Sequence, residues 1–197
     1  MYPTSINEKY MELVINTLRD GGIIIYPTDS LYAIGCNALN NQAIERICRI
    51  KGINPAKTNL SIICHDISQS AEYARIDNRA FRIMKDNLPG PFTFLLPAST
   101  TLPKVFKGRK TVGVRIPDNA IAREIAMRMD SPLLTTSIQW DTEDEAINPE
   151  SIAMRYSDTV DIVIDGGEGG TEPSTVIDIT DSSNPEIIRQ GLGEIEL

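Results

Sequence analysis

The sequence contains almost no histidine: His65 is the only one in 197 residues. A catalytic triad needs a histidine beside its nucleophile, and many zinc sites use two or more histidine ligands. Triads and multi-histidine metal sites are therefore nearly excluded. We predict no metal site built from the protein's own side chains.

Cysteine is also scarce. Cys36, Cys48 and Cys64 make an odd number, and no two of them have CxxC spacing. This pattern argues against a disulfide framework and against a structural zinc site. Cys48 falls on the apolar side of a predicted helix and Cys64 ends an apolar run, so both are predicted to lie in the core.

Long apolar runs are absent as well. No stretch of about 18 apolar residues is present, which argues against a membrane-spanning helix. Residues 1–10 lack the charged start and apolar centre of a secretory signal. With 41% hydrophobic and 23% charged residues, the composition is that of an ordinary water-soluble protein. We predict a cytoplasmic protein with a single domain over residues 1–197.

The net charge of −8 disfavours strong nonspecific binding to nucleic acid. Positive charge is nevertheless concentrated in two segments without acidic residues, 46–65 and 87–117. Their basic residues are Arg46, Arg49, Lys51 and Lys57 in the first, and Lys104, Lys107, Arg109, Lys110 and Arg115 in the second. Two basic segments in an acidic protein indicate a local anion site, although chance clustering on solvated loops gives the same pattern.

Hydrophobic periodicity and cap signals divide the chain into helices and strands. Ser5 and Glu8 match a capping box, and Asp118 is a candidate cap for a later helix. The predicted helices cover about residues 8–20, 41–51, 77–87, 118–129 and 149–156, and the predicted strands cover 23–26, 60–64, 92–96, 111–116, 133–136, 160–164, 175–179 and 186–189. This order predicts an α/β fold (α+β by some schemes) with a large mixed sheet and packed helices. Residues 141–146 are predicted to be a polar loop.

The standard phosphate-binding motifs are missing. The sequence has neither GxxxxGK[ST] nor a GxGxxG segment after a strand. The glycine-rich segment 166–170 includes Glu168 and follows Asp161 and Asp165, whose charges would repel phosphate, so a flexible turn is predicted there. Hydroxyl side chains stand instead at the ends of predicted strands, at 28–30, 111, 135–137 and 174–175. Ligands of open α/β sheets bind beyond strand ends.

Two arginines, Arg115 and Arg189, lie in or beside the same strands. An arginine within an apolar strand is costly to bury unless it is paired. Its planar fork suits a carboxylate or a phosphate. A salt bridge to an acidic residue of the protein would satisfy the same requirement, and the residues alone leave both interpretations open.

Six segments, in order, give the chain a family resemblance that extends from about Gly21 to about Gly193. They are Tyr26–Gly35, Leu88–Pro97, Thr111–Pro117, Leu134–Ser137, Pro173–Asp178 and Ile188–Gly191. On these segments the chain resembles the YrdC-like family. The resemblance implies a twisted mixed sheet, of the YrdC/RibB-like kind, curved around a positively charged cleft. It also implies a threonylcarbamoyl-AMP synthase activity, in which L-threonine, bicarbonate and ATP give threonylcarbamoyl-AMP and pyrophosphate for modification of adenosine 37 in tRNA.

The resemblance also implies roles for individual residues on the threonine side. Ser30 and Arg115 match positions that contact threonine, and Thr135 and Ser174 match contacts near its hydroxyl group. Catalysis of this kind needs no covalent enzyme intermediate. Positioning and charge neutralisation are expected to provide most of the rate increase.

On the nucleotide side, Thr111, Ser137 and Arg189 match contacts of the family. Lys51 matches the first residue of a basic KxR signature, and Lys51 and Arg115 are the residues expected to act in catalysis. The expected cofactor is Mg²⁺ bound with ATP.

Two signatures of the family are altered. The KxR position reads Lys51-Gly52-Ile53, without the arginine, and the SxN position reads Ser137-Ile138-Gln139. In both respects the chain resembles the YciO branch more than the main synthase branch. Members of the family have also been described as binding double-stranded RNA or tRNA. A YciO-type RNA-binding protein without efficient synthase activity is therefore the alternative function.

Overall fold

A computed structural model describes residues 7–54, 60–102 and 110–196. The helices are α1 (Glu8–Arg19), α2 (Asn41–Ile50), α3 (Ile67–Tyr73), α4 (Asn78–Asn87), α5 (Ala120–Met129), α6 (Glu143–Ile147) and α7 (Pro149–Tyr156). The strands are β1 (Ile24–Tyr26), β2 (Ala33–Asn37), β3 (Ser61–Ile63), β4 (Phe92–Pro97), β5 (Thr111–Arg115), β6 (Leu133–Ser137), β7 (Ile162–Val163), β8 (Thr175–Asp178) and β9 (Glu186–Arg189). No helix in these ranges is long and apolar enough to cross a membrane.

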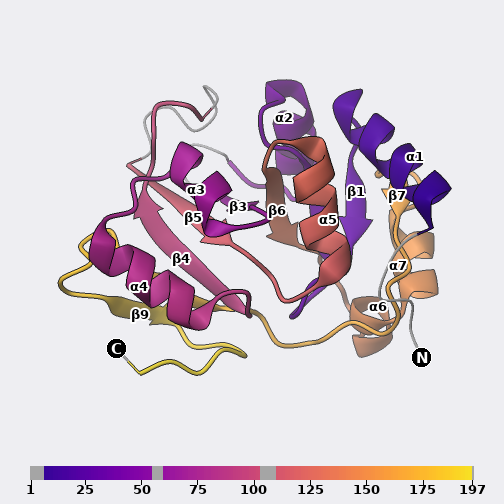
Figure 1. Ribbon diagram of the computed structural model, residues 1–197. Coiled ribbons are helices and arrows are strands. Elements are labelled where there is room, and N and C mark those ends of the chain that lie inside the picture. Colours follow the sequence, from indigo (N-terminus) through magenta and orange to yellow (C-terminus); the bar gives the residue numbers. More distant parts are fainter. Residues whose placement is uncertain (1–6, 55–59, 103–109, 197) are drawn as a thin grey trace.

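The strands form one mixed sheet, in the order β7-β1-β2-β6-β3-β5-β4-β8-β9 (Figure 1). Three neighbouring pairs, β1–β7, β3–β5 and β4–β8, are parallel and the others are antiparallel. This confirms the predicted large mixed sheet with packed helices. The middle of the sheet combines strands that are far apart in the sequence, because β6 lies between β2 and β3.

The register places short side chains next to one another on one face. Gly35 pairs with Thr135, Thr135 with Ser61, and Ser61 with Gly113. Paired residues project to the same side of a sheet. A row without bulky side chains therefore crosses the centre of this face.

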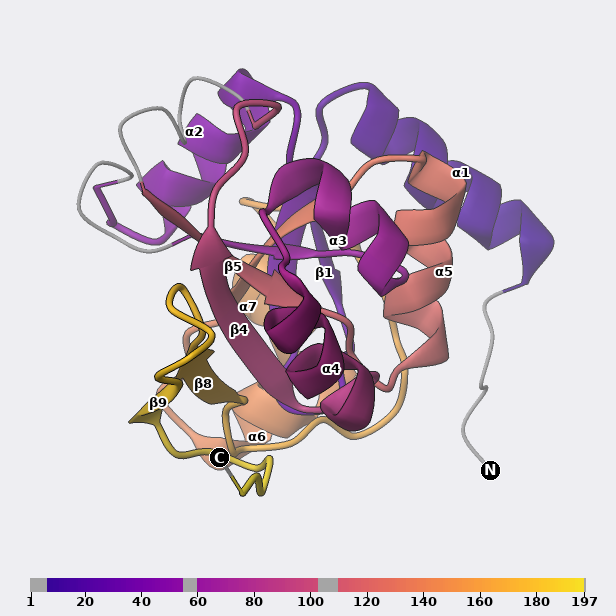
Figure 2. The ribbon, with the colours of Figure 1, turned by 60° about the vertical axis from the view of Figure 1, so that its left-hand side comes forward.

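The helices cover the two faces of the sheet unequally. Helices α1 and α5 pack together on the face that carries the row of short side chains, around Leu18, Ile24 and Ile125 (Figure 2). Helices α2, α3, α4 and α7 contribute to the larger core on the opposite face, which includes Ile47, Ile62 and other buried residues. Helices α1 and α5 therefore cover the first face, the one with the short side chains, over β1 and around Ile63 of β3. The remaining part of this face, which we call the open part, is available for a cleft.

Several local predictions were wrong. The first helix is capped by Asn7, whose side chain accepts a hydrogen bond from the Lys9 amide, and α5 is capped by Asn119 and not by Asp118. The polar segment predicted to be a loop contains the helix α6, capped by Thr142. Strand β2 and helix α3 were not predicted. Cys48 and Cys64 are buried as predicted, and so is Cys36.

Candidate functional site

A cleft of about 360 Å³ lies on the open part of the first face. Seven of its lining residues carry hydroxyl groups and two are arginines: Ser30, Ser61, Thr93, Thr135, Thr136, Ser137, Ser174, Arg115 and Arg189. The apolar part of the lining consists of Leu31, Ala33, Leu95, Pro173, Val176 and Ile188. No carboxylate lines the cleft within the described part of the chain, so its charged groups are both positive.

Arg115, the last residue of β5, lies at the floor of the cleft and is only 8% exposed. Its Nη2 donates to Asp29 Oδ1 over 3.0 Å and to Ser30 Oγ over 2.9 Å. The other carboxylate oxygen of Asp29 accepts a hydrogen bond of 2.8 Å from the Asp118 amide. The salt-bridge interpretation of Arg115 is therefore correct for one end of the guanidinium. Burial lowers the pKa of Arg115, and the charge of Asp29 opposes this effect.

Arg115 Nε is one of three buried polar atoms that lie close together and have no hydrogen-bond partner among the described residues. The other two are Thr135 Oγ1 and Tyr26 Oη. Buried polar groups in proteins are nearly always hydrogen-bonded, and each exception needs an explanation. Arg115 and Thr135 both line the cleft, so two of these unpartnered atoms belong to residues of its wall.

Arg189 forms the opposite wall of the cleft, on the edge strand β9. Its Nη2 donates to the Ser174 carbonyl oxygen over 2.7 Å, and the Ser174 hydroxyl is 2.9 Å from Thr93 Oγ1. The positive charge of Arg189 lowers the pKa of Arg115, which places the two guanidinium groups within electrostatic range. Asp29 offsets the charge of Arg115. Arg189 forms no salt bridge within the described ranges, so its charge favours an anion in this part of the cleft.

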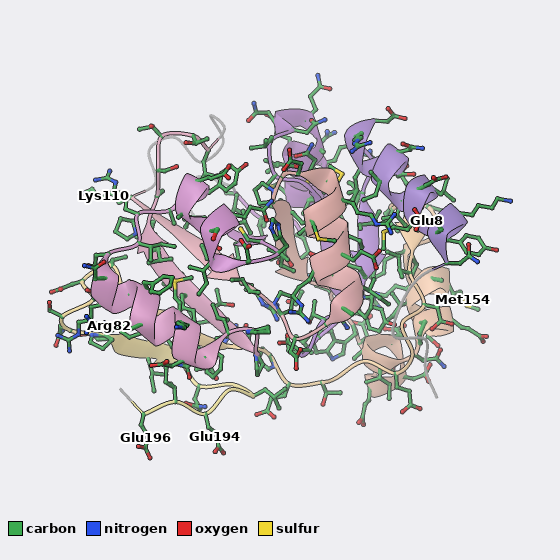
Figure 3. The ribbon with its side chains drawn as sticks, in the orientation of Figure 1. Glu8, Arg82, Lys110, Met154, Glu194 and Glu196 are labelled. Atoms are coloured by element: carbon green, nitrogen blue, oxygen red, sulfur yellow. The ribbon has the colours of Figure 1, made fainter. Side chains whose placement is uncertain are left out.

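The structure brings together six of the eight predicted site residues: Ser30, Arg115, Thr135, Ser137, Ser174 and Arg189. Lys51 lies beside the lining, where its Nζ donates to the Ser137 carbonyl oxygen over 2.5 Å and burial lowers its pKa. Thr111 begins β5, two residues from Gly113, and is outside the lining. Lys110 precedes it and projects from the periphery of the molecule (Figure 3). Lys57, Lys104, Lys107 and Arg109 lie outside the described residues.

The two altered signatures lie next to the cleft, and Ser137 is the one signature residue among its described lining residues. Ile53 is partly buried and packs against the larger core. The backbone of Gln139 is held by Tyr156, whose hydroxyl accepts from the Gln139 amide over 2.8 Å and donates to its carbonyl oxygen over 2.9 Å. Lys51 therefore links the first signature to the second through the Ser137 carbonyl oxygen.

The segment predicted to be a flexible turn, 166–170, bends with a positive φ of 86° at Gly167 and is tied to its neighbours by hydrogen bonds. Tyr32 Oη donates to the Gly167 carbonyl oxygen over 2.8 Å and accepts from the Gly166 amide over 3.0 Å. The Gly170 amide donates to the Ser30 carbonyl oxygen over 3.0 Å, and a Cβ atom at Gly170 would lie 2.3 Å from that oxygen. The glycines are needed for close packing, and the segment holds the loop that carries Ser30.

Several residues of the site were not identified from the sequence. Asp29 and Tyr26 were seen only as neighbours of the hydroxyl cluster, and Thr93 was not singled out. The signal for Thr93 is weak: it is the polar residue of an otherwise apolar strand, Phe92–Pro97. The role of Asp29 depends on a contact with Arg115, 86 positions away in the chain, which no local pattern reveals.

The fold and the site define an α/β protein with a polar, arginine-containing cleft on the open part of a mixed sheet. A family profile described as "Telomere recombination" (Sua5_yciO_yrdC) matches residues 16–191. The chain belongs to this Sua5/YciO/YrdC family, as the six ordered segments predicted.

Relatives include proteins with and without a stated activity. An uncharacterized protein named YciO from Escherichia coli is 38% identical over 199 residues, with 100% of this chain and 96% of the relative covered. Its crystal structure superposes with a TM-score of 0.89, at 37% identity, and the match covers 98% of this chain and 95% of that one. A putative threonylcarbamoyl-AMP synthase from Methanocaldococcus jannaschii is 33% identical, covering 96% of this chain and 89% of the relative.

A structure of Sua5 from Pyrococcus abyssi complexed with L-threonine superposes with a TM-score of 0.85, at 30% identity. The match covers 95% of this chain but only 55% of Sua5. The family thus includes both named synthases and the uncharacterized YciO proteins.

Proposed function

We propose that this chain is a threonylcarbamoyl-AMP synthase-like enzyme, a nucleotidyltransferase that uses L-threonine, bicarbonate and ATP. The observation that carries the proposal is a cleft with two arginines and no carboxylate among its described lining residues, in which Arg115 Nε and Thr135 Oγ1 have no hydrogen-bond partner. Such a site suits a ligand with a carboxylate and phosphates. Relatives named threonylcarbamoyl-AMP synthase support the reaction.

In this proposal Arg115 binds the carboxylate of threonine. One side of its guanidinium is fixed by Asp29 and Ser30, whereas Nε has no hydrogen-bond partner within the described ranges. A guanidinium held in this way loses little freedom when the substrate binds. Thr135 and Ser174 lie on the same floor of the cleft and suit the hydroxyl side of threonine. The threonine complex of the P. abyssi relative supports an amino-acid site in this fold.

In the same proposal, ATP binds on the side of the cleft formed by Arg189 and Ser137. Lys51, which lies beside the lining, and Thr111, which begins β5, also contact ATP. Mg²⁺ would be bound together with the phosphates of ATP. The described residues contain no group of three His, Cys, Asp or Glu side chains suited to a metal ion. Mg²⁺ usually keeps several waters and binds substrate phosphates together with few protein ligands, so these residues are compatible with metal-bound ATP. The ion would neutralise phosphate charge and polarise the reacting phosphate.

The reaction needs no nucleophile from the protein. The amino group of threonine attacks bicarbonate, forming a carbamate and releasing water. A carbamate oxygen then attacks the α-phosphate in line, and the bond to pyrophosphate breaks. Arg115 holds one reactant and Arg189 the other, so the cleft contributes proximity and charge stabilisation. The product would supply N6-threonylcarbamoylation of adenosine 37 in tRNA.

The test is pyrophosphate release that depends on both threonine and bicarbonate, with mass spectrometry of the adenylate product. Activity dependent on all three substrates supports the proposal. If no product forms, the YciO-type RNA-binding function becomes the better proposal. A salt titration of tRNA and double-stranded RNA binding tests it, because an RNA-binding protein must lose affinity steeply with salt.

A further inference from the structure

The third unpartnered atom of the group, Tyr26 Oη, lies behind the cleft wall and is not part of the lining. Tyr26 is fully buried on β1. Its ring extends across Gly35 on β2: a Cβ atom at Gly35 would lie 2.8 Å from Tyr26 Cε1 and 3.0 Å from Oη. Gly35 is paired in turn with Thr135 on β6. The missing side chain at position 35 thus gives the phenol a path toward the Thr135 hydroxyl.

Electrostatic effects agree with this placement. Burial raises the pKa of Tyr26, whereas Thr135 and Arg115 lower it and therefore lie within range of the phenol. Neither the Tyr26 nor the Thr135 hydroxyl has another partner among the described residues. The two hydroxyls consequently depend on each other and on a ligand.

The number of available protons and acceptors decides which hydroxyl donates in a hydrogen bond between Tyr26 and Thr135. If Thr135 donated to Tyr26, the Tyr26 proton would be buried without an acceptor. If Tyr26 donates to Thr135, the Thr135 proton remains for a further acceptor, and a ligand oxygen is the candidate because Thr135 lines the cleft. Each hydroxyl has one proton, and an unsatisfied buried donor is costly. The second arrangement satisfies both donors once a ligand oxygen is present.

We propose that Tyr26 is a positioning residue that orients the Thr135 hydroxyl as a donor and thereby selects a hydroxy amino acid over an isosteric apolar one. This inference rests on the proposed function, in which Thr135 faces the hydroxyl side of threonine. Valine has the shape of threonine with a methyl group in place of the hydroxyl. Valine would leave the Thr135 proton unsatisfied in a dry site, and such sites reject analogues that lack the required oxygen.

The experiment is calorimetric titration of L-threonine and L-valine into four proteins: the wild type, Tyr26→Phe, Thr135→Val and the double variant. In Tyr26→Phe, threonine affinity should fall about fivefold to tenfold, consistent with one hydrogen bond, while valine affinity stays within about twofold. In the Thr135→Val background, Tyr26→Phe should change threonine affinity by less than about twofold, because the residue through which it acts is gone.

Two controls separate this role from a structural one. Tyr73→Phe removes a phenol hydroxyl from the core on the opposite face and should leave the threonine-to-valine preference unchanged. The second control is thermal unfolding of ligand-free Tyr26→Phe: loss of the hydrogen bond to Thr135 should lower the melting temperature only slightly and leave the transition cooperative.

The outcomes are distinguishable. A wild type that binds no threonine would overturn both the proposed function and this inference. Threonine binding by the wild type with an unchanged preference in Tyr26→Phe would overturn the inference alone. Independent, additive losses in the double variant would also overturn it, since Tyr26 would then act without Thr135.

Discussion

Replacing Arg115 by lysine should weaken threonine binding although the positive charge is retained. The guanidinium uses Nη2 for Asp29 and Ser30, and in our proposal its other nitrogens bind the ligand carboxylate. An ammonium group has no fork, so it cannot hold Asp29 and the ligand carboxylate in the same fixed geometry. Hydrogen bonds to charged groups contribute about 1.5–3 kcal/mol. Losing one therefore weakens affinity about tenfold to 150-fold.

Calorimetric titration of L-threonine measures the effect of Arg115→Lys directly. Arg128→Lys is the matched control, since Arg128 pairs with Glu8 and Glu124 on the helices α1 and α5, away from the cleft. The control should keep wild-type affinity, and thermal unfolding should show that both variants fold. Equal threonine affinity in Arg115→Lys and the wild type would refute the placement of the carboxylate on this guanidinium.

Three further predictions concern the nucleotide side, the glycine segment and the altered signatures. Arg189→Ala should weaken ATP·Mg²⁺ binding about tenfold or more in calorimetry, because one charged contact is lost. Threonine affinity should stay within about twofold of the wild type. Unchanged ATP affinity would remove Arg189 from the nucleotide site. Gly170→Ala should lower threonine affinity, because its Cβ would meet the Ser30 carbonyl oxygen at 2.3 Å and displace that loop; a variant with normal affinity would show that the loop position is unimportant. Ile53→Arg combined with Gln139→Asn should raise the rate of threonine-dependent pyrophosphate release, by up to about a hundredfold to a thousandfold if one preorganised donor is restored, and either change alone should do little. A wild type as fast as a relative with both signatures intact would show that the alterations are harmless.

Much of the fold followed from the sequence because most strands are short apolar runs with clear ends. Strand β2 escaped prediction because its sequence, Ala33–Asn37, includes a glycine, an alanine and an asparagine and lacks the β-branched pattern of an independent strand. The strand is stabilised by its hydrogen-bonded pairing with β1 on one side and β6 on the other, which local propensity does not reveal. Helix α6 was missed for a related reason: five residues, three of them acidic, resemble a solvated loop.

The site was predicted in part. Hydroxyl groups at strand ends can be recognised one at a time, and the sheet order then brings Ser30, Thr135 and Ser174 together. The partner of Arg115 and the orientation of Tyr26 depend on contacts between distant strands, so no local pattern contains them. The close packing of the glycine segment was not predicted, because a glycine selected for close packing cannot be distinguished in sequence from one selected for flexibility.

The strand order has a consequence for folding. The cleft joins Ser30, which precedes β2, to Arg189 on the edge strand β9, and the intervening walls come from β6, β5 and β8. A partly folded chain that lacks any one of these strands has no complete ligand site. Ligand should therefore bind only the fully assembled sheet and raise the free energy of global unfolding by mass action. The complete site should form slowly during folding, because pairing distant strands requires the closure of long loops.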